Sequence, residues 1–110
     1  MIKIKVFTDE NRILGIEVNG HANYADIGKE DIVCSAVSSV IQTAMLGLMQ
    51  VVGIKLQYSN DDQKGYLNFN LPQKITDNQK HDAQIILNTM ICGINDLHEG
   101  FSDFIELEVL

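Results

Sequence analysis

Basic residues and cysteines are scarce in this chain, and each scarcity excludes a class of protein. Eight Lys and Arg stand against fifteen Asp and Glu, which gives a formal net charge of −7 over 110 residues. Proteins that bind a phosphate backbone need clustered Lys and Arg, so we expect no nucleic-acid partner. Two cysteines, behind a start that lacks the apolar run of a secretory signal, predict cytoplasmic thiols rather than a disulfide framework.

Proline and low-complexity sequence are almost missing too, so nothing divides the chain into parts. Pro72 is the only proline, and no repeat or linker-like tract is visible. Hydrophobic residues make up 45 % of the chain, which is enough for a core without metal or disulfides. We therefore expect residues 1–110 to form a single domain.

Charged residues are absent from one long segment, residues 32–54, which raises the question of a membrane. The same segment contains six polar side chains, namely Ser35, Ser38, Ser39, Gln42, Thr43 and Gln50. A helix that crosses lipid rarely contains so many polar groups. We interpret the segment as a buried helix of a soluble protein and expect no membrane partner.

Alternation of apolar and polar residues predicts five strands. They cover residues 2–7, 14–18, 54–58, 67–71 and 105–109. The first two flank the turn "DENR" and form a hairpin by pattern and turn chemistry, with Leu14, Ile16 and Val18 resuming the alternation. The residues 59–65, "SNDDQKG", form the turn between the third and fourth strands. Glu106 and Glu108 alternate with apolar residues in the last strand.

Helical spacing predicts two long helices. Asp31 is a suitable N-cap for a helix over Ile32–Val52, which Gly53 can end. Its apolar stripe comprises Val33, Val37, Val40, Ala44, Leu48 and Val51, widened by Ile41, Met45 and Val52. An apolar surface this wide is usually covered on more than one side, by a sheet and a second helix or by a second subunit.

The second helix has start and stop signals of its own. Thr76 and Gln79 form a candidate capping box, and Gly100 is placed to end the helix in a left-handed conformation. Between them Ala83, Ile86, Leu87, Met90, Ile94 and Leu97 recur at helical spacing. The order β-β-α-β-β-α-β, with hairpins, predicts an α+β fold of two main helices against a mostly antiparallel sheet.

One connection is too long for so small a protein. Residues 19–31 join the hairpin to the first helix, and loops of this length are usually functional or disordered. Gly20 and Gly28 lie near its two ends and would let it bend sharply. His21 lies at one side of this flexible loop and Cys34 at the other. We therefore ask whether the fold brings the two together.

A cysteine at this place suits sulfur chemistry, because Cys34 would lie in the first turn of a helix. A free thiol has a pKa of about 8.5, and a dominant thiolate needs a shift costing roughly 2.7 kcal/mol. A helix N-terminus supplies about 0.3–1 kcal/mol, or ~2 at best. A nearby imidazolium could close the gap, and His21 is the nearest candidate. Ser38, four residues after Cys34, shares its helical face, while Asp31 could cap the helix or orient His21.

On the sequence pattern alone, the same residues could also have ordinary structural roles. A cysteine in an apolar helix is most often a small core residue, and a loop histidine is most often a surface group. Cys92 is off the main stripe of its helix and has no ionisable partner in sequence. A zinc site built from His21, Cys34, Cys92 and His98 would lack the usual ligand spacing, so we expect no metal. The sequence contains no phosphate loop, dinucleotide-binding fingerprint or serine nucleophile elbow. We therefore expect no other chemistry of these classes and no cofactor.

The stretch "GHANYADIGKEDIVCSAVS" resembles the signature of the bacterial ribosomal-processing cysteine proteases called Prp. In that family Gly-His-Ala is followed, after a small loop with glycine, by Asp-Ile-Val-Cys and a nearby serine. The similarity extends over the whole chain in length, hairpin start, uncharged first helix and long second helix. One departure is Ser35, where the family more often has alanine.

The resemblance implies a homodimer whose nucleophile matches Cys34 and whose base matches His21. Asp31 and Ser38 match supporting positions of the family. The implied substrate is the precursor of large-subunit ribosomal protein twenty-seven, whose short N-terminal extension is removed by cleavage after an aromatic pair. No cofactor is implied, and the loop between His21 and Cys34 is expected to order over the peptide.

Two other functions remain as alternatives. A non-catalytic, ribosome-associated dimeric binding module would use His21 and Cys34 only as loop and helix-cap residues, with an ordinary thiol pKa at Cys34. A thiol redox sensor would instead use the reversible oxidation of Cys34.

Overall fold

The computed structural model describes residues 1–21 and 32–110, and its elements follow the predicted order. They are β1 (Ile2–Asp9), β2 (Arg12–Asn19), α1 (Ile32–Leu46), η1 (Gly47–Val51), β3 (Gln57–Asp61), β4 (Tyr66–Asn70), α2 (Asp77–Gly100) and β5 (Ile105–Val109). The five strands form one sheet in the order β3-β4-β2-β1-β5. All neighbours are antiparallel except β1 and β5, which are parallel. The predicted α+β fold is confirmed.

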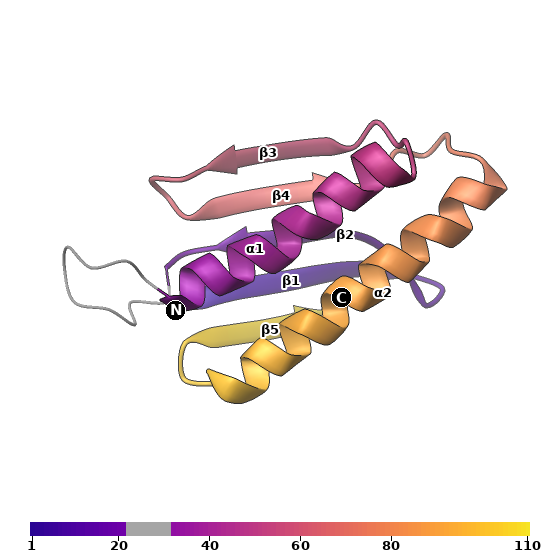
Figure 1. Cartoon of the computed structure of the whole chain (residues 1–110). Helices are drawn as coiled ribbons and strands as arrows, with labels where there is room; N and C mark the ends of the chain where they lie inside the picture. Colours follow the sequence, from indigo (N-terminus) through magenta and orange to yellow (C-terminus); the bar gives the residue numbers. More distant parts are fainter. Residues whose placement is uncertain (22–31) are drawn as a thin grey trace.

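Both helices cover the same face of the sheet (Figure 1). Side chains from β1, β2, β4 and β5 point into this layer because alternate residues of a strand face the same side. The core lies there and includes Ile2, Ile4, Val6, Ile16, Val33, Ile41, Leu48, Phe69, Leu87, Ile94 and Ile105. Among the described residues, no polar or charged side chain is buried.

The first helix differs from the prediction in its last turn. It is α-helical to Leu46 and then forms the π-helical segment η1, in which the amide of Val52 donates to the carbonyl of Gly47 over 3.0 Å. A π-turn inserts an extra residue and rotates everything after it around the helix axis. Val51, expected in the buried stripe, is therefore 82 % exposed. Gly53 ends the helix at φ 81°, as predicted.

By length and composition, Ile32–Val51 is one helix that could cross a membrane. In the folded chain, apolar residues of this helix pack against the rest of the protein. Val33, Val37, Ile41, Ala44 and Met45 of α1 are buried inside the protein, where they pack in the core.

The hairpin β1–β2 is present, but its inner face is not as predicted. Glu10 and Asn11 occupy the turn with positive φ, as tight hairpin turns require. The register then shifts, because Phe7 pairs with Gly15 and Thr8 pairs with Ile13. This bulge leaves Leu14 as the extra residue, so Leu14 is 40 % exposed and Ile13 is buried in its place.

The third strand and the conformation at the end of the second helix also differ from the prediction. The third strand starts at Gln57 rather than residue 54 and continues to Asp61, so the first three residues of the expected turn are strand. Gly100 is the last residue of α2 and does not have a positive φ, because Phe101 takes the cap position instead. The start of α2 agrees with the prediction, since the Thr76 hydroxyl accepts from the Gln79 amide and the Gln79 side chain accepts from the Thr76 amide.

Candidate functional site

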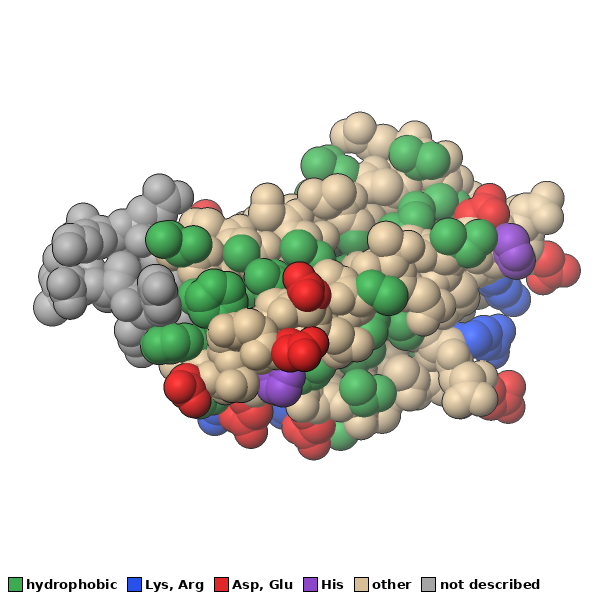
Figure 2. Space-filling model, turned by 60° about the horizontal axis from the view of Figure 1, so that its bottom comes forward, with side chains coloured by type: hydrophobic (Ala, Val, Ile, Leu, Met, Phe, Trp, Pro, Cys, Tyr) green, Lys and Arg blue, Asp and Glu red, His purple; other side chains and the backbone are tan. Residues whose placement is uncertain are grey.

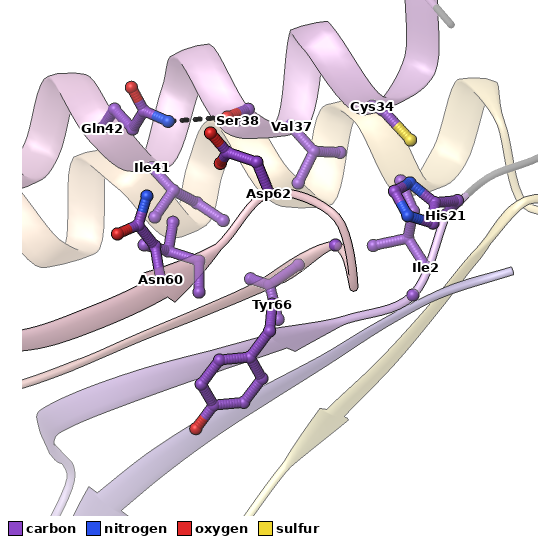
Figure 3. Close-up of a pocket in the computed structure, with 14 residues that line it drawn as sticks. Ile2, His21, Cys34, Val37, Ser38, Ile41, Gln42, Asn60, Asp62 and Tyr66 are labelled. Carbon is purple, nitrogen blue, oxygen red and sulfur yellow. Dashed lines mark hydrogen bonds between the residues drawn. The ribbon is translucent and has the colours of Figure 1, made fainter.

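A cavity of about 160 Å³ opens between the start of α1 and the nearby ends of β2, β3 and β4. His21 and Cys34 both line it, and Figure 3 shows the sulfur of Cys34 and the His21 ring at the same end. His21 follows β2 directly, whereas Cys34 is the third residue of α1. The fold thus brings together the two residues that the sequence left thirteen positions apart.

The backbone at His21 is fixed by contacts on both sides. Gly20 has φ 95°, and a Cβ there would lie only 2.6 Å from the Met1 carbonyl oxygen, so the position requires glycine. The Met1 α-amino group donates to the His21 carbonyl over 2.6 Å. Gly20 also donates its amide to the Gly65 carbonyl over 3.0 Å. His21 therefore leaves the sheet in a defined direction although its side chain is exposed.

The ring of His21 is held by the β3–β4 turn. Its Nε2 lies 3.3 Å from the carbonyl oxygen of Gln63. A carbonyl oxygen can only accept, so this contact favours the neutral tautomer with the proton on Nε2 and the lone pair on Nδ1. The contact therefore selects the tautomer of the histidine, as an orienting group does in nucleophile–base pairs.

This turn has its own stabilising contacts. The Asp61 carboxylate accepts from the amides of Gln63 and Lys64 over 3.1 and 3.3 Å, which is an Asx-type turn. Gly65 closes the turn at φ 64°. A Cβ at Gly65 would collide with the Gly20 carbonyl and lie 3.0 Å from His21 Cε1. The close approach of the turn to His21 thus depends on glycine.

Helix α1 supplies the opposite wall. Cys34 is partly buried there, in the first turn of the helix, where the helix dipole favours negative charge. Ser38 follows one turn later on the same wall, as predicted. Its hydroxyl oxygen accepts from the Gln42 side-chain amide over 2.8 Å, so its own proton is left to donate elsewhere.

The wall formed by β3, β4 and their turn was not predicted from the sequence. Asn60, Asp62 and Tyr66 line the cavity from this side, and Figure 3 shows Asp62 between Ser38 and His21. The only local signal was the turn composition of residues 59–65, which says nothing of what the turn contacts. Asp31 and Gly28, predicted as a supporting residue and a loop glycine, lie outside the described residues.

The second cysteine is not part of this site. Cys92 is exposed on α2 and lines a different hollow with Arg12 and His81. Within residues 1–21 and 32–110, no group of three or more His, Cys, Asp or Glu could hold a metal ion. The zinc arrangement considered from the sequence is not assembled there.

Comparisons with known proteins agree on one family. The ribosomal processing cysteine protease Prp of Bacillus subtilis is 28 % identical over 91 residues, covering 83 % of this chain and 80 % of its own length. That of Staphylococcus aureus strain Mu50 is 25 % identical over 99 residues, with 90 % and 89 % covered.

Solved structures have the same fold. The S. aureus protease Prp with a covalently linked product peptide superposes with a TM-score of 0.86 at 24 % identity, covering all of both chains. The Streptococcus mutans protein SMU.848 gives 0.85 at 24 % identity, covering all of this chain and 94 % of its own. The profile of the family described as cysteine protease Prp matches residues 1–106. This chain therefore belongs to the Prp family of cysteine proteases.

Proposed function

We propose that this protein is an endopeptidase with a dyad of His21 and Cys34. It acts in the cytoplasm and removes the short N-terminal extension of large-subunit ribosomal protein twenty-seven. The observation that supports the dyad most directly is the single cavity lined by both side chains. Family membership supports the reaction class, since members are described as cysteine proteases.

The first step is proton transfer from sulfur to nitrogen. Because Nε2 of His21 donates to the Gln63 carbonyl, Nδ1 is the atom that accepts the Cys34 proton. The resulting imidazolium keeps its Nε2 contact and stabilises the thiolate at the start of α1. Asp31 and Ser38 act as supporting residues, Asp31 before the first turn of the helix and Ser38 one turn after the nucleophile.

Peptide cleavage then proceeds through a covalent intermediate. The thiolate attacks the scissile carbonyl carbon, forming a C–S bond and a tetrahedral oxyanion. The oxyanion collapses, the C–N bond breaks, and His21 protonates the departing amine. Water, deprotonated by His21, then attacks the thioester, and the C–S bond breaks to release the acid and the thiol. No step needs a metal or a cofactor.

The proposed substrate is supported by the relatives and by charge. The curated relatives are named as ribosomal processing proteases, and one solved relative is an S. aureus Prp in complex with a substrate peptide. A net charge of −7 would speed the encounter with a basic ribosomal protein. We propose further that residues 1–110 act as one domain within a homodimer.

The test uses the purified precursor of the ribosomal protein and mass spectrometry of the products. Cys34→Ala removes the nucleophile and His21→Ala removes the base, so each is expected to lower kcat/KM by at least about 10³-fold. Cys92→Ala is the matched control, because this thiol is exposed on α2, outside the cavity. Its kcat/KM is expected to stay within twofold of the wild type.

Thermal melting of all variants checks that the losses are chemical. Full trimming by either Cys34→Ala or His21→Ala would reject the dyad. Trimming of a different protein, with this precursor left intact, would instead reject the substrate and keep the dyad.

A further inference from the structure

The cavity at Cys34 does not end at the catalytic pair. A second hollow, of about 220 Å³, adjoins it between α1, η1 and the strands β3 and β4. Gln42, Asn60 and Leu67 line both hollows, so the two lie next to each other along one groove beside α1. Figure 3 shows Gln42 and Asn60 at the end of the first cavity that is farther from Cys34 and His21.

The second hollow has apolar walls of an adaptable kind. Met45 is buried, Met49 and Leu67 are partly buried, and Leu46 and Tyr58 are exposed at its rim. Methionine side chains are flexible and make favourable contacts with aromatic rings. A cavity of about 150 Å³ is known to hold benzene, so this hollow has room for one large apolar or aromatic side chain.

The helix sets the distance between the two ends of this groove. Met45 is eleven residues after Cys34 in the same helix, which is about 16 Å at 1.5 Å per residue. An extended peptide advances about 3.3 Å per residue, so about five residues cover that length. The side chain that enters the distal hollow therefore belongs to a residue four to six positions from the scissile bond.

Polar groups along the groove can hold the backbone of such a peptide. The side-chain amides of Gln42 and Asn60 come from opposite walls and are both exposed. Among the described strands, β3 is the end strand of the sheet and has a neighbour on one side only. Extended peptides commonly bind next to such an edge, with alternate side chains in pockets.

The π-helical segment η1 adds an independent observation. Met49 belongs to this segment, and its neighbour across the groove is β3. Such π-turns are rare and occur often at functional sites.

We propose that this distal hollow is a specificity subsite for a large apolar side chain of the substrate peptide. The proposal rests on the proposed peptidase function and deepens it. Occupation of the subsite binds the ground state and the transition state alike, so it lowers KM and leaves kcat unchanged. Substrates too short to reach it are cut with a higher KM.

The first test is a peptide series with one Phe or Ala at each of positions three to seven on either side of the scissile bond. Burying an aromatic side chain changes binding by tenfold or more, so kcat/KM is expected to fall about tenfold for Ala at one position, through KM. A series in which no position changes kcat/KM by more than twofold would overturn the subsite.

The second test blocks the hollow from the protein side. Met49→Trp fills it, so the Phe and Ala peptides are expected to be cut equally, while a peptide ending before that position is cut as by the wild type. Gln50→Trp is the matched control, because Gln50 is exposed in the same segment and does not line the hollow. It is expected to keep the tenfold preference.

A third variant covers the case in which the new indole disturbs folding. Met49→Ala enlarges the hollow and is expected to shift the preference from Phe toward Trp at the same position. If both Gln50→Trp and Met49→Trp still cut the peptides but lost the preference for Phe over Ala, the subsite would be overturned. Failure of the wild type to cut any peptide or the precursor would reject the proposed function itself.

Discussion

At the scale of single residues, glycine rather than charge makes the candidate site possible. Gly20 and Gly65 both have positive φ, and the Gly20 carbonyl lies where a Cβ on Gly65 would go, while the Met1 carbonyl blocks a Cβ on Gly20. Their contact brings the Gln63 carbonyl to the His21 ring. The base is therefore oriented by a backbone group, whose position depends on residues without side chains.

Replacing Gly65 with Ala should disturb both stability and catalysis. The new Cβ would collide with the Gly20 carbonyl at a φ that alanine rarely adopts. We expect a loss of more than about 1 kcal/mol in the free energy of unfolding, measured by urea denaturation. Because the turn must move away from His21, kcat/KM should also fall, by more than the loss of folded protein explains.

Gly100→Ala is the control for this change. Gly100 is the last residue of α2, without a positive φ, and nothing lies within 4 Å of the position of a Cβ. Alanine favours a helix over glycine by about 0.5–1 kcal/mol, so stability should stay equal or rise. Equal behaviour of the two variants would contradict the role given to the Gly65 contact.

At the scale of elements, α1 combines three functions along its length. Its first turn holds Cys34, its middle packs in the core, and the segment η1 that follows it lines the distal hollow. The buried side of α1 covers only part of the helix surface, and Ser35 and Ser39 of the same helix are exposed. The buried apolar residues of this helix thus belong to the core, whereas Ser35 and Ser39 face outward.

A charge in the middle of α1 should therefore prevent folding. Val37 is 2 % exposed within the single chain, and burying an unpaired carboxylate costs several kcal/mol. We expect Val37→Asp to be unfolded or insoluble, as measured by circular dichroism and melting. Ser35→Asp places the same group at an exposed position of the same helix, outside the groove between α1 and α2, and should melt within a few degrees of the wild type. A folded Val37→Asp protein with unchanged melting would show that this face is open.

At the scale of the whole molecule, the face that the helices turn away from the sheet remains partly apolar. A groove of about 650 Å³ runs between α1 and α2, lined in part by Val40, Val51, Ile85 and Ile86. Val51 is 82 % and Ile85 56 % exposed. Figure 2 shows apolar side chains grouped over the helices with acidic ones between them. Such surfaces often bind another protein, which supports the proposed homodimer.

The dimer is tested by the mass of the protein in solution. We expect light scattering to give twice the 12.3 kDa of one chain for the wild type. Val51→Glu or Ile85→Glu is expected to lower the measured mass to that of one chain. Val109→Glu is the control, since Val109 is similarly exposed but lies on β5. A wild-type mass of one chain at micromolar concentration would reject the dimer. A dimer unaffected by Val51→Glu and Ile85→Glu would place its interface elsewhere.

The sequence by itself determined the order of the elements, the capping box of α2 and the motif around His21 and Cys34. Each of these depends on residues close together in the chain, whose spacing and turn chemistry are local. The tertiary structure alone decided that Leu14 faces outward, that Val51 leaves the core and that the β3–β4 turn reaches His21. Strand register, helix phase and contacts between residues forty positions apart depend on how the elements pack, and no local pattern records that packing.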